Sequence, residues 1–459
     1  MMGGHFWPLV GLLLGVAACT GPDAPREDRP TRSDAGSATG SEAGASPTPE
    51  QGTLLATSGV ALGGHLGDDW DASLAGDDGG ADVGLPPRIG GDAAWTNAVP
   101  SGMPQVVNSG GPTVTSPVFQ SVTFANYNLT TSVDDLVSRI GLTSYWLKAV
   151  GEYGIGLARA ATPVHLAEGA PQNIDDVQIQ EWLTSELSAG GPFEPPASGT
   201  VYILFYPFST SITFDGQESC FTMGAYHNSL VVAGVDVAYA VVPECASDTR
   251  TIEQATTGAA SHEMIEAVTD PLPLGATPTY ASVDPGHLYY PLVLGGGEVA
   301  DLCAQWPSSF FVPDDLPYMV QRTWSNAAAL AGRDPCQPEL DGETFFNAVP
   351  TLTDTVHVGD STQNLTTLGA AIAPGASKVV DVILYSEADV GPWTVSALSV
   401  PVGGSNLLFA WDKTTGNNGD TLHLTITVNY LGSSYGGEPF IIESTLGAET
   451  NYWLGYVGQ

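Results

Sequence analysis

The chain has 459 residues, of which 50 are Asp or Glu and 12 are Lys or Arg, so its formal net charge is −38. A field of that sign repels the phosphates of nucleic acids and the headgroups of anionic lipids, so we exclude both as binding partners. The same field favours cations, calcium among them. The length suits two or more domains, and the 55 Gly and 34 Pro residues suit a loop-rich exported protein.

Residues 1–18 predict a signal peptide. Leu9–Ala18 is apolar but too short to span a bilayer as a stable helix, and it ends in small residues directly before Cys19. This arrangement resembles the lipobox of bacterial lipoproteins, in which cleavage leaves the cysteine as the lipid-bearing first residue. The alternative is an ordinary secretory signal peptide. We expect a lipoprotein that Cys19 anchors in the cell envelope, facing the periplasm or the cell exterior.

Residues 19–110 predict a low-complexity tether between this lipid anchor and the folded part. Residues 21–50 are rich in Pro, Ser, Gly, Ala and Asp and contain almost no large apolar side chain. Such a segment cannot bury enough surface to offset the entropy of ordering it. A later group of aspartates between Asp68 and Asp82 lacks the spacing of a calcium loop and indicates a solvated linker.

Residues 111–340 predict an α/β or α+β domain with a buried sheet. Ser116–Phe124 alternates like a strand, and Thr200–Tyr206 is a continuous apolar run typical of a strand buried on both faces. Leu230–Val242 indicates a pair of strands. Apolar residues at helical spacing occur in two further stretches, Val133–Tyr153 and Ile179–Leu187. Helices that alternate with buried strands define this class of domain.

The next helix, Thr251–Thr269, carries the residues with the clearest chemistry. His262 and Glu266 are four positions apart, so they share one face and can reach one metal ion together. Glu263 follows His262 at the position of the general base in HExxH metallopeptidases. Glu266 stands where those enzymes have a second histidine. A carboxylate is an acceptable zinc ligand but a harder one, so calcium is the alternative ion.

A metal site needs at least three protein ligands. Glu298 and Asp301, one turn apart if their segment is helical, are candidates for the third and fourth, and His227 is another. Small residues around His262 on the helix indicate that it points inward. Buried carboxylates need a counter-charge, and the chain has few basic residues to supply it. A cation is the simplest solution; a structural hydrogen-bonded network is the alternative. Arg322 is a further candidate, for binding a carboxylate.

Several blocks occur together in an order that resembles the exordium-like (phosphate-induced protein 1) family of secreted plant proteins and related bacterial exported proteins. The blocks are Tyr226-His227, the HExxEAxTDP run from His262 to Pro271, the ExxDxC run from Glu298 to Cys303, and Trp324-Ser325-Asn326. The resemblance covers about residues 111–340. It implies an exported location and a metal-type motif, but it does not imply a reaction.

Four cysteines remain when Cys19 is set aside, and an even number in an exported chain predicts two disulfides. Pairing in chain order gives Cys220–Cys245 and Cys303–Cys336, although the other two connectivities stay open. No CxxC spacing occurs, which disfavours a structural zinc knuckle.

Residues 341–459 lack the resemblance and predict an all-β, sandwich-like domain. Short β-rich runs are separated by Gly, Asn and Asp at the spacing of an antiparallel sandwich. The runs are Thr353–Val358, Lys378–Leu384, Trp393–Val400, Asn406–Trp411, Thr421–Asn429 and Phe440–Thr445.

Two functions follow from these patterns. The first is a zinc-dependent, peptidase-like hydrolase in which His262, Glu266 and an acid from Glu298 or Asp301 hold the metal and Glu263 is the general base. Its partners are the membrane, through the lipid anchor, and a peptide or cell-surface polymer. The second is a non-catalytic envelope or adhesion protein in which the same cluster is structural.

Overall fold

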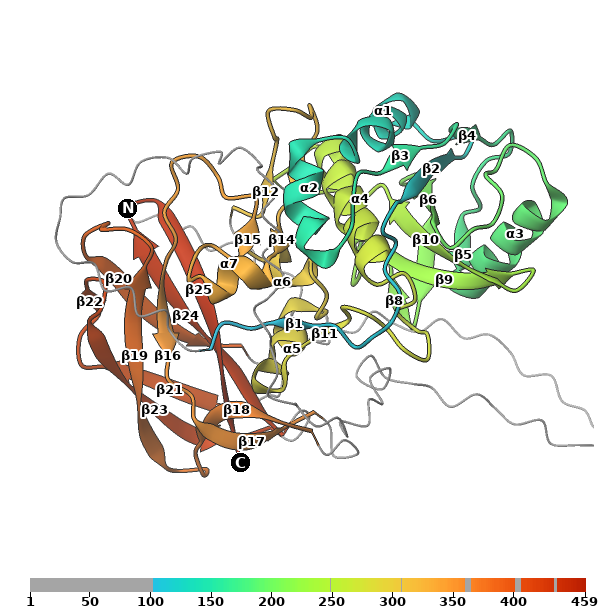
Figure 1. The fold of residues 1–459 in the computed structure, drawn as a ribbon. Coiled ribbons are helices and arrows are strands. Elements are labelled where there is room, and N and C mark those ends of the chain that lie inside the picture. Colours follow the sequence, from blue (N-terminus) through green and yellow to red (C-terminus); the bar gives the residue numbers. More distant parts are fainter. Residues whose placement is uncertain (1–101, 248, 307, 360–364, 401–405, 433–435) are drawn as a thin grey trace, which may run out of the picture. The chain divides into compact units, whose positions relative to one another are not determined.

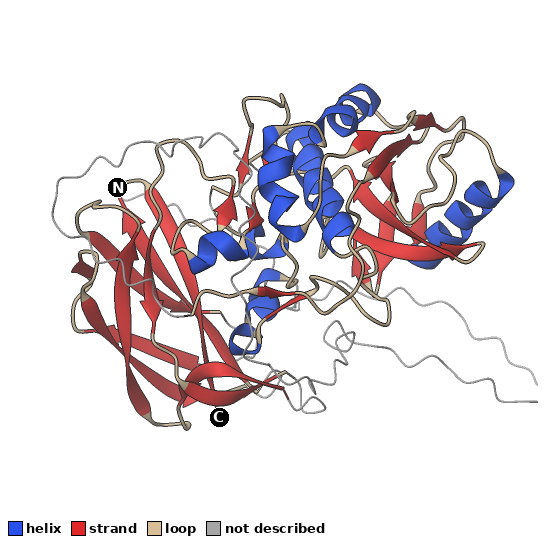
Figure 2. Ribbon diagram, viewed as in Figure 1, coloured by secondary structure: helices blue, strands red, loops and turns tan. Residues whose placement is uncertain are grey.

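The computed structural model describes residues 102–459 apart from residues 248, 307, 360–364, 401–405 and 433–435. The predicted signal peptide, Cys19 and the tether up to residue 101 lie outside the described residues. The described part is mostly β-strands in several sheets, with few helices (Figure 2). None of its helices is long and apolar enough to cross a membrane.

A mixed sheet forms the centre of the first half of the described chain. Its order is β3-β2-β6-β10-β9, and β4 also pairs with β2. The strands β2, β6 and β10 run parallel, whereas the edge strand β9 runs antiparallel to β10. The bounds are β2 Val118–Thr123, β3 Arg159–Ala160, β4 Val164–His165, β6 Thr200–Tyr206, β9 Tyr226–Val232 and β10 Val235–Pro243.

Helices lie on both faces of this sheet (Figure 1). On β6, Tyr202, Leu204 and Tyr206 pack into one core with Leu183 of α3. The alternate residues of β6 are equally buried and face the side that α4 covers. This two-sided burial confirms the prediction for residues 200–206. The helices are α1 Thr130–Ile140, α2 Ser144–Val150, α3 Asp176–Ala189, α4 Ile252–Thr269, α5 Tyr290–Leu294, α6 Asp301–Ala304 and α7 Asn326–Leu330.

The helix predicted over residues 133–153 is instead α1, α2 and the 3-10 turn η1 Gly151–Tyr153. The break falls at Gly141, where a Cβ atom would lie 2.4 Å from the side chain of Ala158, so the chain passes too closely for any other residue. Thr143 then caps α2 by accepting a hydrogen bond from the backbone of Trp146. The strand pair over 230–242 is confirmed, with a turn whose residues Ala233 and Gly234 both have positive φ.

The helix α4 begins and ends as the sequence predicts. Thr251 and Gln254 form a reciprocal capping box at its start, and the chain leaves the helix at Asp270 before a proline. Side chains are buried almost all round its second half, where it packs against β6, β9 and β10. A helix enclosed in this way holds its polar side chains inside the domain.

Residues 102–110, which the sequence assigns to the tether, are packed against the domain. Val106 and Val107 form strand β1, which pairs with β11 Ser282–Val283. Val106 is 2% exposed, and its backbone N–H and C=O both bond the side chain of Asn326 at 2.8 Å. Pairing with a strand so distant in sequence leaves no local pattern, so the tether's predicted end at residue 110 is too late.

The described chain also contains several small sheets. One contains β5 Asn173–Asp175, β7 Ser211–Phe214 and β8 Gln217–Glu218. Two pairs of short strands follow α6, and they are β12 Phe310–Phe311 with β13 Val320–Gln321 and β14 Thr323–Trp324 with β15 Cys336–Gln337. A 3-10 turn, η2 Pro285–His287, precedes α5. Both disulfides predicted in chain order are present, Cys220–Cys245 and Cys303–Cys336.

The C-terminal region is sandwich-like, with a four-stranded sheet in the order β16-β19-β23-β21 and a six-stranded sheet in the order β17-β18-β25-β24-β20-β22. All six predicted runs are strands, and β16, β18, β22 and β25 are additional. The bounds are β16 Phe346–Pro350, β17 Asp354–Val358, β18 Leu365–Ala371, β19 Ser377–Ser386, β20 Trp393–Ser399, β21 Asn406–Trp411, β22 Thr415–Gly416, β23 Thr421–Tyr430, β24 Gly437–Leu446 and β25 Glu449–Gly458.

Candidate metal site

The helix α4 supplies three side chains to one buried cluster. The Nε2 atom of His262 lies 3.0 Å from Oε2 of Glu266 and 3.9 Å from Oε1 of Glu263. The i,i+4 spacing therefore brings the histidine and the carboxylate together, as the sequence predicts. Both carboxylate side chains are almost completely buried, at 6% exposed for Glu263 and 4% for Glu266.

The edge strand β9 brings His227 to the same place. Its neighbours Tyr226 and Asn228 bond Asp176 of α3, on the opposite face of the sheet. Because side chains alternate along a strand, His227 points toward α4. Its Nδ1 atom lies 3.4 Å from Oε2 of Glu263 and 3.8 Å from Oε2 of Glu266.

The turn that enters α6 supplies the remaining acids. Oδ1 of Asp301 lies 3.5 Å from Nε2 of His262, and Oε2 of Glu298 lies 3.5 Å from Nε2 of His227. The other oxygen of Glu266, Oε1, accepts hydrogen bonds from the backbone N–H groups of Ala300 and Asp301 at 3.1 and 3.0 Å. The structure thus gathers all six predicted residues, His227 included, into one cluster.

In each histidine, the ring nitrogen that does not face Glu263 and Glu266, here called the outer nitrogen, lies beside a hydrogen-bond acceptor. Nδ1 of His262 lies 3.0 Å from Oε1 of Gln321, whose amide nitrogen donates to the carbonyl of Ala300 at 2.7 Å. Nε2 of His227 lies 3.1 Å from the carbonyl oxygen of Asp270. Both partners are acceptors, so these ring nitrogens donate. A histidine that binds a metal commonly has such an outer partner, which fixes its tautomer.

The inner nitrogens, Nε2 of His262 and Nδ1 of His227, then face the carboxylates of Glu263 and Glu266. On neutral rings these nitrogens carry lone pairs, and a lone pair repels a carboxylate oxygen unless a cation lies between them. Zinc bonds of about 2.0–2.1 Å place tetrahedral ligand atoms about 3.3–3.4 Å apart. The separations between these nitrogens and the carboxylate oxygens, 3.0 to 3.9 Å, lie around that value. The residues therefore fit a divalent metal ion.

The acids perturb one another's titration. Burial raises the pKa of Asp301 to about 7, and the charge of Glu266 adds to this. Burial and the charges of Glu266 and Asp270 also raise the pKa of Glu298 well above its usual value. Burial opposes ionisation of Glu266 too, but His262 outweighs it and lowers the pKa of Glu266 to about 2. The cluster holds more negative charge than its own histidines compensate.

The acids in turn raise the pKa values of the two histidines. Burial acts to lower the pKa of His262, but the charges of Glu266 and Glu263 outweigh it, so this pKa lies well above its usual value. The pKa of His227 is raised in the same way, because its contact with Glu263 and the charge of Glu266 outweigh its burial. Within the described residues, no Lys or Arg side chain forms an ion pair with the acids of the cluster. A proton or a metal ion must supply the positive charge.

The cluster is not sealed. The side chain of Asp301 is 19% exposed, that of His262 14% and that of Glu298 12%, whereas His227 is 6% exposed. Solvent therefore reaches the cluster from the side of α6. This side is also held in place covalently, because Cys303 of α6 is joined to Cys336.

Arg322 is turned away from the cluster, and the carboxylate that it pairs with in the structure is that of Asp334. Its guanidinium bonds Asp334, Ser308 and two backbone carbonyl groups, and the residue is 1% exposed. Its neighbour Gln321 is the residue that contacts His262, and sequence reasoning missed it. The lipidation site Cys19 lies outside the described residues.

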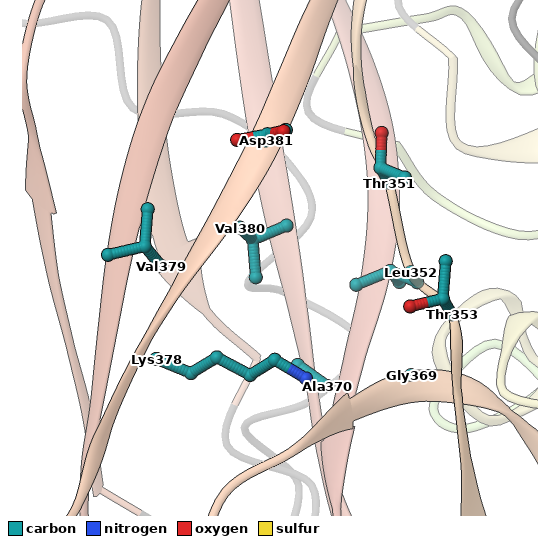
Figure 3. Close-up of a pocket in the computed structure, with 9 residues that line it drawn as sticks. All are labelled: Thr351, Leu352, Thr353, Gly369, Ala370, Lys378, Val379, Val380 and Asp381. Carbon is teal, nitrogen blue, oxygen red and sulfur yellow. The ribbon is translucent and has the colours of Figure 1, made fainter.

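A surface hollow elsewhere in the protein does not coincide with the cluster. It has a volume of about 210 Å³ and is lined by residues 351–353, Gly369, Ala370 and residues 378–381 of the sandwich-like region (Figure 3). Lys378 and Asp381 are the charged residues of its lining, and the lining includes no histidine or cysteine. We assign no metal chemistry to it.

Comparison with known proteins does not identify a family. No protein-family model matches the chain, and no curated protein sequence matches it. Among solved structures, a chimeric titin Z1Z2 fragment is 14% identical over 25% of this chain and 95% of its own, with a TM-score of 0.14. A family 123 glycoside hydrolase from Clostridium perfringens is 10% identical over 24% of this chain and 26% of its own, with a TM-score of 0.16. Likenesses this weak establish no function.

Proposed function

We propose that the chain is an exported, lipid-anchored protein whose central domain, of α/β class and related to the exordium-like family, is a zinc-dependent, peptidase-like hydrolase. The observation that carries this proposal is the orientation of the inner ring nitrogens of His262 and His227 toward Glu263 and Glu266. Ring nitrogens favour zinc, whereas calcium takes oxygen ligands.

The proposed roles follow from the distances. His262 and Glu266 hold the ion, and Asp301 completes the set because its Oδ1 lies 3.5 Å from Nε2 of His262. A bound zinc ion supplies a water molecule of lowered pKa. Glu263, beside the same nitrogen, accepts a proton from the attacking water and passes it to the departing amine. One C–O bond forms and the C–N bond of the substrate breaks.

A peptide is the substrate class that the surrounding sheet supports. β9 is the outermost strand in the order of its sheet, and it carries His227. Extended peptides add to sheet edges through backbone hydrogen bonds. A peptide paired with β9 would run beside the cluster. A cell-surface polymer with peptide cross-links offers the same chemistry.

The test uses the full chain, purified without chelator. We expect about one zinc ion per chain or more, and the loss of at least one ion in His262→Ala. Glu263→Gln should keep the metal while hydrolysis of a quenched fluorescent peptide mixture falls roughly 10²–10⁴-fold. Glu253→Gln, an exposed residue in the first turn of the same helix, is the control and should leave both unchanged. Unchanged hydrolysis in Glu263→Gln would exclude this mechanism.

A second candidate is a non-catalytic envelope or adhesion protein. The raised pKa values of His262 and His227 support it, because two imidazolium ions could pair with the carboxylates without any metal. It predicts a purified chain without metal and no activity that depends on Glu263.

A further inference from the structure

The cluster contains two histidines, each with a different acidic neighbour. A different acid lies 3.5 Å from each ring: Oδ1 of Asp301 from the inner Nε2 atom of His262, and Oε2 of Glu298 from Nε2 of His227, on the ring edge that also donates to the carbonyl of Asp270. Both histidines also approach one shared oxygen, Oε2 of Glu266, at 3.0 and 3.8 Å. The sequence leaves open whether Glu298 or Asp301 completes a metal site. In the structure each of these acids lies next to a different histidine.

The ligand atoms fall into two groups rather than one. The atoms of His262, Glu263 and Glu266 lie within 4.8 Å of one another, and so do those of His227, Glu266 and Glu298. The two histidines do not share a group, and only Glu266 belongs to both. Two ion positions, one in each group, would therefore lie side by side with Glu266 between them.

Asp270 gives a further indication that the group of His227, Glu266 and Glu298 binds a cation. Asp270 is fully buried, and among the described residues its Oδ2 atom has no hydrogen-bond partner, whereas Oδ1 accepts a hydrogen bond from the backbone N–H of Thr279 at 2.8 Å. Its backbone carbonyl contacts Nε2 of His227, and its carboxylate lies beside Glu298. An unpaired buried carboxylate oxygen is costly unless a cation balances it.

We propose that the cluster binds two divalent transition-metal cations that share Glu266. The other ligands of one ion are His262 and Asp301, whose Oδ1 lies 3.5 Å from Nε2 of His262, and those of the second ion are Nδ1 of His227 and the carboxylate of Glu298. Glu263 also belongs to the first group, and we assign it a different role. This inference rests on the proposed function, since it adds a second ion to the same site. Hydrolytic sites with two metals hold them about 3.5–4 Å apart, where they stabilise both the attacking and the leaving atoms.

Glu263 has a defined place in such a centre. Its two oxygens lie 3.9 Å from Nε2 of His262 and 3.4 Å from Nδ1 of His227, so its carboxylate lies between the two histidines. From there it can take a proton from a water held between the ions. The general-base role that the sequence gives Glu263 is thus kept.

The experiment is zinc stoichiometry on the full chain, stripped with chelator and reloaded with zinc alone. We expect about two ions per chain in the wild type and about one in either His262→Ala or His227→Ala. The double variant should bind none. His423→Ala, an exposed histidine of the sandwich-like region, is the control and should keep both ions. If an alanine variant does not fold, Asp301→Asn and Glu298→Gln replace it.

A measurement on the wild type needs no variant. Loading with manganese(II) should give magnetically coupled pairs in electron paramagnetic resonance spectra, because the two ions share a ligand. If the wild type bound one ion per chain and both histidine variants lost it, the proposal of a second ion would be wrong, but the proposed function would be unaffected. Two uncoupled manganese signals would overturn the sharing of Glu266. No metal in the wild type would overturn the proposed function itself.

Discussion

Gln321 holds His262 by accepting a hydrogen bond at Oε1 from the Nδ1 atom of the ring, at 3.0 Å. The direction is fixed because the Gln321 amide nitrogen donates to the carbonyl of Ala300, and its backbone N–H donates to Ser261 at 2.9 Å. The amide therefore cannot rotate to offer its nitrogen to the ring without losing a buried bond. The inner nitrogen of His262 is left facing the carboxylates.

Replacing this amide should weaken metal binding without removing a ligand. We expect Gln321→Leu to lower zinc affinity about 10–100-fold, the usual cost of losing the outer partner of a metal-bound histidine. Competition with a chromophoric chelator measures the Kd. Gln172→Leu, at an exposed position, is the matched control. An unchanged Kd in Gln321→Leu would show that the ring needs no outer partner.

The stability of the metal-free protein should fall as pH rises through the titration of the cluster. Folding raises the pKa of Asp301 from 3.8 to about 7, chiefly through burial, so the folded state binds more protons between these values. A raised pKa contributes stability that is fully present below the unfolded pKa and lost as pH rises through the folded one. His262, whose pKa lies well above 6.5 because of its acidic neighbours, extends the loss to higher pH.

Thermal unfolding from about pH 4 to about pH 9 isolates this effect when wild type is compared with Asp301→Asn. The stability of the wild type relative to this variant should fall between pH 3.8 and about 7 and then level off. Zinc should remove the decline, since it displaces protons from its ligands. A difference that is independent of pH would contradict the burial of an ionisable Asp301. The pKa of Glu266, lowered from 4.5 to about 2, contributes stability that is lost only as pH falls through these values, so it affects the acid end of this range alone.

The sequence predicts the parts of the site that follow local periodicity and cannot predict those that depend on tertiary pairing. The i,i+4 spacing identifies His262 and Glu266, and the capping residues identify the bounds of α4. Gln321 carries no signal, because a neutral amide 59 residues away matches no metal pattern. Arg322, the candidate that the sequence offers for binding a carboxylate, is the neighbour of Gln321, and neighbours in an extended chain point in opposite directions.

The end of the tether shows the same limit. The pairing of β1 with β11 joins segments far apart in the chain, and each strand has only two residues. By contrast, the strand over 200–206 is apolar throughout because it is buried on both faces, so composition alone reveals it. Local composition therefore predicts a long strand at the centre of a sheet better than a two-residue strand that pairs with a distant segment.

The disulfide Cys303–Cys336 should support the site as well as the fold. It closes a separation of 33 residues, and its replacement by two alanines should cost about 2–4 kcal/mol of unfolding free energy. Because α6 presents the backbone N–H groups that bind Glu266, zinc affinity should fall too. Replacing Cys220–Cys245, with a separation of 25, is the control and should lower stability without changing the Kd for zinc. Urea unfolding and chelator competition measure the two effects.

Asp176 should control metal binding from the opposite face of the sheet. It is 6% exposed, and its oxygens accept hydrogen bonds from the hydroxyl groups of Tyr226 and Tyr239 and from the amide of Asn228 at 2.8, 2.6 and 3.0 Å. Tyr226 and Asn228 are the residues on either side of His227. The carboxylate therefore fixes the rotation of β9 that aims His227 at α4.

We expect Asp176→Asn to weaken zinc binding about 10–100-fold while the folded structure remains, because an amide cannot accept the same set of bonds at both ends. The Kd for zinc and the absorption spectrum of the cobalt-substituted protein are the measurements, since a purely structural role would lower stability without changing the spectrum. Asp175→Asn is the matched control: Asp175 is the exposed N-cap next to it, and Asn caps a helix equally well. An unchanged cobalt spectrum in Asp176→Asn would show that β9 holds His227 without help from α3.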